Sequence, residues 1–310
     1  MRIIFMGTPD FAVPSLEVVA EEHEVVAVVT QPDRRRGRGQ RITYSPVKSW
    51  ALKRGLEILQ PERIANPEFI DKLETYGADL FVVVAFGQKI PTRLLEMPKF
   101  GCINVHSSLL PKYRGAAPIN AAIVQGENIT GVSTMYLSEE WDAGDLILQA
   151  EEPIYPHDTA GTLHDRLMEK GAILLSETLR QIETGQAPRI PQDHAKATFA
   201  FKLSREDAYV DFSRPALELV NLIRGMNPWP GAHTLIAGES VKIWQAVAVE
   251  QSGSPGCILA VQDRGLVVGC GEGALLLQEL QRPNSKAVSG QDFANGLRLN
   301  VGDCLQRQEE

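Results

Sequence analysis

The sequence predicts an α/β protein whose first domain has a mostly parallel sheet with helices on both faces, followed by a small C-terminal β-barrel. Strand-like and helix-like segments alternate as far as residue 184, as in parallel strands joined by helical crossovers. Several strand-like runs are continuously apolar and β-branched, which is typical of strands covered on both faces. Beyond a proline-containing break, short β-rich runs separated by glycines replace this alternation.

Periodicity and chain breakers define the elements of the first domain. Segment 11–21 has helical spacing, with Pro14 in the first turn, where proline is tolerated. Gly185 is a C-cap for a long helix that precedes it. The expected strands are residues 2–6, 24–30, 56–59, 79–86, 101–105, 131–137 and 146–154, and the expected helices are residues 11–21, 46–54, 67–76, 117–125 and 159–184.

A break in the pattern indicates two domains. Residues 185–196, G-Q-A-P-R-I-P-Q-D-H-A-K, contain two prolines and no periodicity, which is typical of an interdomain linker. We therefore expect a first domain over residues 1–189, a linker over 190–204 and a second domain over 205–310. The second domain is expected to hold a helix at 215–224 and strands at 241–249, 257–261, 266–270 and 274–280.

The composition is that of a soluble globular protein, with 310 residues, 44% hydrophobic and 23% charged. No apolar run approaches the ~20 residues that span a bilayer, and the N-terminus is interpreted as a strand rather than a signal peptide. The cysteines lie far apart without a C-x-x-C, so neither metal ligation nor a disulfide framework is expected. These are Cys102, Cys257, Cys270 and Cys304. A cytoplasmic location fits.

The net charge of −8 is a weak argument against a nucleic-acid partner. Residues 34–41, R-R-R-G-R-G-Q-R, nevertheless hold five arginines in eight positions. Such a run is usually a solvated flexible loop, but guanidinium groups also grip phosphates through paired hydrogen bonds. Both interpretations stay open for Arg34, Arg35, Arg36, Arg38 and Arg41.

Asn104 and His106 stand two apart at the end of an apolar strand in I-N-V-H. Strand geometry directs both side chains to one face, at the carboxyl end of a predicted parallel strand, where open α/β sheets bind ligands. Glycine and proline bound the loop that follows. Position alone leaves a catalytic role and a structural role open.

Asp142 lies in W-D-A-G-D, after the strand predicted at 131–137. The D-A-G-D segment also suits a turn, because Asp and Gly are common turn residues. Position alone cannot decide whether Asp142 or Asp145 would have a catalytic role. A set of Asn, His and Asp without a Ser or Cys nucleophile suits general acid–base acyl transfer. No metal is needed for that chemistry.

Two further features favour structural roles. Gly7 follows the first strand but is not part of G-x-G-x-x-G, so a dinucleotide site is poorly supported. Trp229, in N-P-W-P-G, is interpreted as a core side chain.

The combined motifs resemble one family. I-N-V-H-S-S-L-L-P-K-Y-R-G-A-A-P-I (103–119) with D-A-G-D (142–145) resembles the signature of the 10-formyltetrahydrofolate-dependent formyltransferases. M-G-T-P-D-F-A-V-P-S-L, T-Q-P-D-R with G-R-G, N-P-W-P-G-A and D-F-A-N-G resemble, more narrowly, the members that formylate methionyl-tRNA. The resemblance extends from residue 1 to about residue 300.

This resemblance implies a Rossmann-like catalytic domain, a C-terminal OB-like barrel that contacts tRNA, and a monomer. It implies Asn104, His106 and Asp142 as the catalytic set, which selects Asp142 over Asp145. The implied partners are initiator methionyl-tRNA, for translation initiation, and 10-formyltetrahydrofolate as co-substrate.

The resemblance also implies two binding regions. Arg38, between two glycines, would contact the acceptor stem, with Arg34, Arg35, Arg36 and Arg41 as further candidates. The implied folate-binding residues are Phe86, Gly87, Ser108, Leu109, Leu110, Pro111 and Gly144.

Four alternative functions are less well supported by the sequence. A formyltetrahydrofolate hydrolase and an aminosugar-nucleotide formyltransferase would share the N-terminal architecture, but the arginine run favours tRNA. A non-catalytic RNA-binding protein would not need the complete Asn–His–Asp set. A nucleotide-sugar oxidoreductase is weakened by the missing G-x-G-x-x-G.

Overall fold

The computed structural model describes residues 1–36, 41–263 and 265–305, and the chain divides into two compact units. The first unit consists of Met1–Pro118, Ile129–Pro153 and His164–Ala200. The second consists of Ile119–Asn128, Ile154–Leu163 and the chain from Phe201 onward. Segments from the middle of the chain therefore belong to the second unit.

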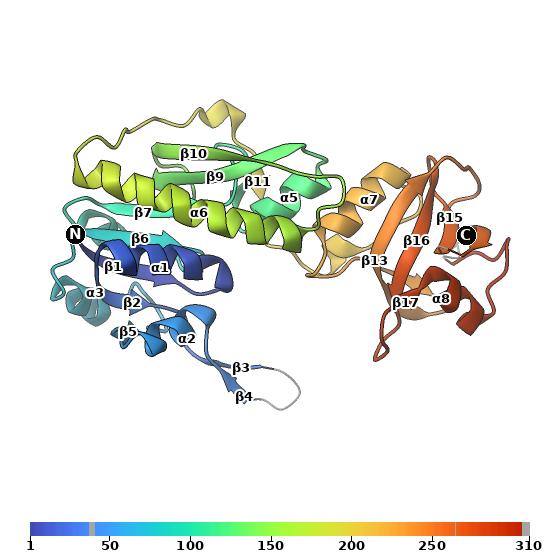
Figure 1. The fold of residues 1–310 in the computed structure, drawn as a ribbon, viewed down its shortest axis with the longest axis horizontal. Helices are drawn as coiled ribbons and strands as arrows, with labels where there is room; N and C mark the ends of the chain where they lie inside the picture. The colour runs from blue at the N-terminus through green and yellow to red at the C-terminus, as the bar shows by residue number, and fades with distance from the viewer. Residues whose placement is uncertain (37–40, 264, 306–310) are drawn as a thin grey trace. The chain divides into compact units, whose positions relative to one another are not determined.

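The first unit is built on a seven-stranded sheet in the order β10-β9-β7-β6-β1-β2-β5 (Figure 1). Neighbours from β7 to β5 pair in parallel, whereas β9 and β10 are antiparallel. After β1, the chain adds β2 and β5 on one side of β1. It then returns to β1 and adds β6 on the other side. The strands are β1 (Arg2–Gly7), β2 (Glu24–Val29), β5 (Ile58–Leu59), β6 (Leu80–Val84), β7 (Cys102–His106), β9 (Ile129–Tyr136) and β10 (Leu146–Pro153).

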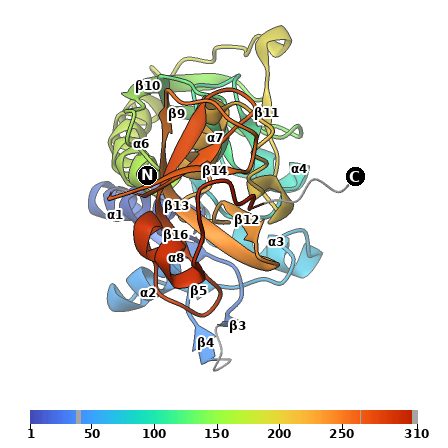
Figure 2. The ribbon, with the colours of Figure 1, turned by 90° about the vertical axis from the view of Figure 1, so that its right-hand side faces the viewer.

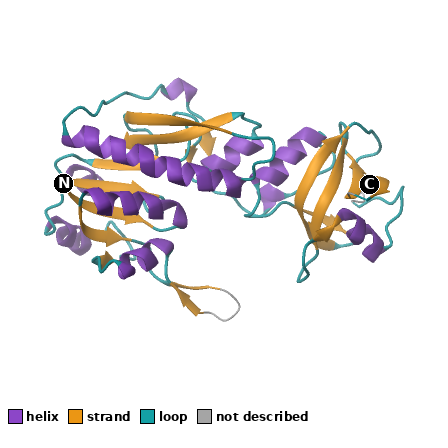
Figure 3. Ribbon diagram, viewed as in Figure 1, coloured by secondary structure: helices purple, strands orange, loops and turns teal. Residues whose placement is uncertain are grey.

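Helices cover both faces of this sheet (Figure 3). Successive residues of β1 are fully buried, which requires packing on each side. Ile4 and Met6 join a core with Ile70 and Leu73 of α3 on one face. The long helix α6 lies on the opposite face. The helices are α1 (Val13–Glu22), α2 (Pro46–Lys53), α3 (Pro67–Glu74), α4 (Thr92–Glu96) and α6 (Ala160–Glu183).

The register of β7 assigns its side chains to the two faces. A Cβ at Gly171 of α6 would stand 3.1 Å from a methyl group of Val105, so Val105 faces α6. The Cys102 thiol instead donates to the Leu94 carbonyl of α4, on the other face. Because side chains alternate along a strand, Asn104 and His106 share the face of Cys102.

The second unit has an antiparallel sheet in the order β12-β13-β16-β15-β14, with β17 beside β16. Phe293 and Ala294 of α8 join the core formed by β15 and β16, against which α8 lies (Figure 2). This OB-like architecture, with the mostly parallel sheet, confirms the predicted fold class. The elements are α5 (Pro118–Val124), α7 (Ala216–Gly225), α8 (Gly290–Leu297), β12 (His233–Ile236), β13 (Glu239–Val249), β14 (Ile258–Gln262), β15 (Gly265–Gly269), β16 (Ala274–Gln281) and β17 (Val288–Ser289).

Short elements appear where the sequence predicts loops. The arginine run begins and ends in a hairpin of β3 (Arg34–Arg36) and β4 (Arg41–Thr43). The segment expected to be an aperiodic linker contains β11 (Phe199–Ala200), which pairs in parallel with β8 (Arg114–Gly115). These pairings are too short to produce a visible alternation in the sequence.

Two expectations for the second unit are wrong. Trp229 is 60% exposed rather than a core side chain. Cys257 and Cys304 form a disulfide, although their sequence separation is 47. The reason is that the segment after α8 returns to the start of β14, where Ile258 donates to the Asp303 carbonyl and Leu305 to the Gly256 carbonyl. Among the described residues, no helix is both long and apolar enough to cross a membrane.

Candidate active site

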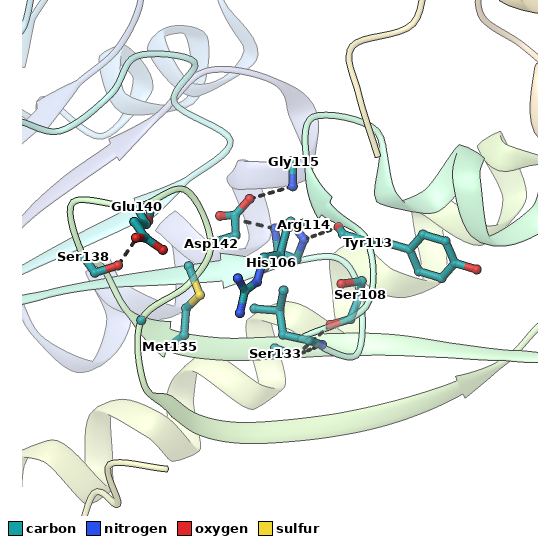
Figure 4. Close-up of polar contacts among 12 residues, drawn as sticks. His106, Ser108, Tyr113, Arg114, Gly115, Ser133, Met135, Ser138, Glu140 and Asp142 are labelled. Atoms are coloured by element: carbon teal, nitrogen blue, oxygen red, sulfur yellow. Dashed lines mark hydrogen bonds and ion pairs between the residues drawn. The ribbon is translucent and has the colours of Figure 1, made fainter. Parts of the chain in front are cut away.

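His106 is the last residue of β7 and is buried, 6% exposed. Each of its ring nitrogens faces an oxygen atom of the protein (Figure 4). Nε2 lies 2.9 Å from the carbonyl oxygen of Tyr113. A carbonyl can only accept, so Nε2 carries the hydrogen, and Nδ1 of the neutral ring has a free lone pair. Nδ1 faces Oδ1 of Asp142 at 3.8 Å. This is too long for a hydrogen bond, and it leaves Nδ1 as the nitrogen available for proton transfer.

Asp142 is fixed in the loop between β9 and β10 by its backbone and by its carboxylate. Its φ of 51° is left-handed, a conformation that Asp tolerates better than most residues. Oδ2 accepts a hydrogen bond of 2.8 Å from the Gly115 N–H. The side chain is 9% exposed, so the carboxylate that faces His106 is held within the protein.

Asn104 differs from His106 in having no internal partner. It is 9% exposed, and its side-chain amide makes no hydrogen bond to any other residue that the structure describes. Neither amide atom is among the described side-chain atoms that are fully buried without a partner, so both can be reached from outside the protein. Asn104 can therefore offer both a donor and an acceptor to a ligand on the His106 side of β7.

The S-L-L-P segment uses its side chains inside the protein. The Ser108 hydroxyl is buried and donates to the Lys112 carbonyl at 2.6 Å. Leu110 packs in a small core with Met135 and Leu146 and precedes Pro111 through a cis peptide bond. Leu109 lies against Gly131. A ligand on this loop would meet backbone groups and only part of Leu109 and Pro111.

The other residues predicted to bind folate lie at two places. Phe86 is buried after β6, and its carbonyl accepts from the Thr8 hydroxyl at 3.2 Å and from Gln31 at 3.1 Å. Gly87 is exposed with a φ of 88°. Gly144 follows Asp142, and a Cβ there would collide with the Tyr136 carbonyl oxygen. Glycine is therefore required at 144 by close packing against β9.

The exposed backbone near Phe86 lies at the topological switch point of the sheet. Strands β2 and β6 flank β1 on opposite sides, so the direction in which successive strands are added to the sheet reverses between β1 and β6. Ligands of open α/β sheets bind outside the carboxyl ends of strands at this point. Ala85 there has a left-handed φ of 47° and is exposed, and unusual backbone conformations of this kind collect at functional sites.

The arginine run is separate from this group of residues in the sequence and is anchored at its base. Arg34 is exposed, the backbone of Arg35, Arg36 and Arg41 lies in the hairpin, and Arg38 falls outside the described residues.

Asp33, immediately before the hairpin, accepts from Lys48 at 2.5 Å and from Gln60 at 2.9 Å. Burial acts to raise the pKa of the Asp33 carboxyl, but the hydrogen bonds from Lys48 and Gln60 and the Lys48 charge hold that pKa below its usual value.

The sequence predictions missed the residues that connect the loops of His106 and Asp142. Tyr113 holds His106 through its backbone carbonyl, and Arg114 is a buried side chain of β8. The Arg114 guanidinium donates to Gln192, and the Gln192 amide donates to the carbonyls of Asp142 and Gly144. No local signal identifies Gln192, because it lies in the segment predicted to be an interdomain linker.

Comparisons with known proteins cover nearly the whole chain. The family model described as "Formyl transferase" matches residues 1–179, and "Formyl transferase, C-terminal domain" matches residues 202–298. The methionyl-tRNA formyltransferase of Bacillus subtilis is 48% identical, covering 98% of this chain and 97% of that protein. The methionyl-tRNA formyltransferase of Acetivibrio thermocellus is 45% identical, covering 98% and 99%.

Solved structures share the fold at lower identity. WlaRD, a sugar 3N-formyl transferase, superposes with a TM-score of 0.68 at 19% identity, covering 92% of this chain and 99% of its own. HypX from Aquifex aeolicus in complex with tetrahydrofolic acid gives a TM-score of 0.64 at 21% identity, covering 100% of this chain and 50% of its own.

Proposed function

Because this chain belongs to the methionyl-tRNA formyltransferase family, we propose that it transfers the formyl group of 10-formyltetrahydrofolate to the α-amino group of methionine on initiator methionyl-tRNA. The observation that carries this proposal is the 45–48% identity to such enzymes over 98% of the chain, through both compact units. The buried His106–Asp142 pair supports it, because the reaction needs a proton acceptor.

His106 and Asp142 would receive the proton that the attacking amine loses. The Nδ1 lone pair and the Asp142 carboxylate face each other at 3.8 Å without a hydrogen between them. An N–H of the substrate amine can donate to both. When Nδ1 takes the proton, the imidazolium gains Asp142 as a counter-charge. His106 can then return the proton to the departing nitrogen, directly or through water.

Asn104 is placed to stabilise charge that develops during the transfer. As the amine attacks the formyl carbon, negative charge collects on the formyl oxygen, and a positioned donor there is worth about 3 kcal/mol. The Asn104 amide shares a face of β7 with His106 and has no hydrogen-bond partner in the described part of the chain. Its N–H groups therefore need not leave a protein partner in order to donate.

The carboxyl ends of β1 and β6 form the proposed folate region. The folate supplies a formyl group already activated on nitrogen. The exposed backbone at Ala85 and Gly87 suits a flat polar ring system that hydrogen-bonds to main-chain groups. Because the side chains of Ser108 and Leu110 are internal, the S-L-L-P loop would contribute through its backbone.

Contacts with the tRNA far from the amine would separate this substrate from free methionine. Binding energy from remote parts of a substrate can position its reacting group. The arginine hairpin is the proposed acceptor-stem contact, through Arg34, Arg35, Arg36 and Arg41, together with Arg38, which lies outside the described residues. The OB-like unit is the proposed second contact, because such barrels bind nucleic acids through their strands and loops.

The decisive experiment measures formyl transfer from 10-formyltetrahydrofolate to initiator methionyl-tRNA, with elongator methionyl-tRNA and free methionine as comparison substrates. We expect transfer to the initiator tRNA to dominate. A parallel reaction without acceptor measures hydrolysis of the folate. Hydrolysis that matches or exceeds transfer would overturn the proposal in favour of a hydrolase.

A further inference from the structure

Gln192 is 6% exposed although its segment lacks regular structure. All four hydrogen-bonding positions of its amide are used. Nε2 donates to the Asp142 carbonyl at 2.9 Å and to the Gly144 carbonyl at 2.7 Å. Oε1 accepts from Nε of Arg114 at 3.1 Å and from Nη2 at 2.7 Å.

The chemistry of these partners fixes the orientation of the amide. Carbonyls only accept and a guanidinium only donates, so exchanging Oε1 and Nε2 would turn all four contacts into repulsions. The Gln192 amide therefore connects the loop of Asp142 to strand β8 in a single arrangement. No other side-chain hydrogen bond to the Asp142 or Gly144 carbonyl is found among the described residues.

Strand β8 holds the other end of Asp142. The Gly115 N–H binds its carboxylate at 2.8 Å, and Arg114 is the neighbouring residue. Asp142 is thus fixed by its carboxylate through Gly115 and by its carbonyl through Gln192. We propose that Gln192 is a positioning residue for the formyl transfer, which keeps the Asp142 carboxylate in place beside His106. This inference rests on the function proposed above.

Arg114 makes the choice of variant important. It is buried, and within the described residues it has no carboxylate partner. Gln192→Met would leave Nε and Nη2 of Arg114 without their acceptor and would cost stability as well as position. Gln192→Glu keeps an acceptor for Arg114 and places a carboxylate oxygen against the two carbonyls. The second variant therefore tests the Asp142 side of the contact while the Arg114 side is preserved.

The test compares Gln192→Glu and Gln192→Met with wild type, with Gln186→Glu as a matched control. Gln186 lies in the same segment, is exposed and receives the same change of charge. We expect both Gln192 variants to lose about tenfold to a hundredfold in kcat per folded molecule, since small misplacements have such effects. KM for both substrates should change by less than about threefold, because Gln192 itself is not among the residues proposed to bind either substrate.

Dependence on Asp142 separates positioning from a general structural defect. In an Asp142→Asn background, Gln192→Glu should change kcat by less than about twofold, since residues that act together are not additive. An undiminished loss in that background would overturn the inference, as would a kcat equal to that of Gln186→Glu. If Gln192→Met does not fold, the kcat of Gln192→Glu alone tests the inference.

A readout without catalysis keeps this inference apart from the proposed function. Hydrogen exchange of the Gly115 amide, which donates to Asp142, should accelerate in Gln192→Glu and not in Gln186→Glu. Unchanged exchange would contradict the inference even if the enzyme proves inactive. An inactive wild type with accelerated exchange in the variant would refute the proposed function alone.

Discussion

Two loops leave the same edge of the first unit's sheet, one after β7 and one after β2, and they are held very differently. The loop after β7 is fixed through its backbone and its buried side chains, with Tyr113 bound to His106 and Arg114 to Gln192. The loop after β2 is a short hairpin, anchored before its first strand at Asp33. This contrast suggests that rigidity is concentrated where the proposed proton transfer takes place, whereas the proposed phosphate contact needs only positive charge on an anchored hairpin.

The largest expected effect tests the rigid loop. His106→Ala removes the imidazole that faces Asp142 and should reduce kcat by at least about two orders of magnitude, given typical acid–base contributions. Thermal unfolding should show a folded protein. His157→Ala, an exposed histidine, serves as the matched control. Near-normal kcat in His106→Ala would remove His106 from the mechanism.

Asp142→Asn also tests the residues held by the loop after β7. Asn can keep the left-handed backbone and accept from Gly115, but it loses the negative charge beside His106. We expect kcat to fall about tenfold to a hundredfold, the worth of a hydrogen bond to a charged group. KM for the folate should stay close to wild type. A loss confined to KM would assign Asp142 to binding instead.

Arg38→Ala tests the hairpin and should have a smaller effect, confined to one substrate. KM for methionyl-tRNA should rise severalfold, and the slope of log(kcat/KM) against log salt should become shallower by about 1, as for a lost phosphate contact. KM for the folate provides the internal control. Equal changes for both substrates would contradict a role in tRNA binding.

Asp33→Asn, at the base of the hairpin, should have the smallest effect. Because Lys48 and Gln60 lower the pKa of the carboxyl in the folded protein, the folded state binds fewer protons than the unfolded state between the two pKa values. The stabilisation is therefore present above the unfolded pKa of about 3.9 and is lost as pH falls through the folded value.

We expect Asp33→Asn to lower stability by up to about 1 kcal/mol at neutral pH. Urea titrations at neutral and acid pH measure this difference, which should shrink in acid. A constant difference at all pH values would mean that the charge of Asp33 is not responsible.

Local rules predicted more of the sheet than of the site. Strand alternation was enough to predict Asn104 and His106 on one face of β7, because it depends only on neighbouring residues. Gln192 contacts Arg114 across 78 positions, and Cys257 pairs with Cys304 across 47. Neither contact leaves a periodic signal. The exposure of Trp229 is likewise a property of the assembled second unit and not of the local motif.

The pairing of β8 with β11 has a consequence for dividing the protein. A fragment of residues 1–189 would contain His106 and Asp142 but would lack Gln192 and Thr198. The Thr198 hydroxyl accepts from the Tyr113 N–H, and the Thr198 carbonyl accepts from the Arg114 N–H. Such a fragment would retain every group proposed for the chemistry while losing the backbone that keeps them in register. A self-sufficient catalytic half should therefore extend to Ala200, where the first compact unit ends.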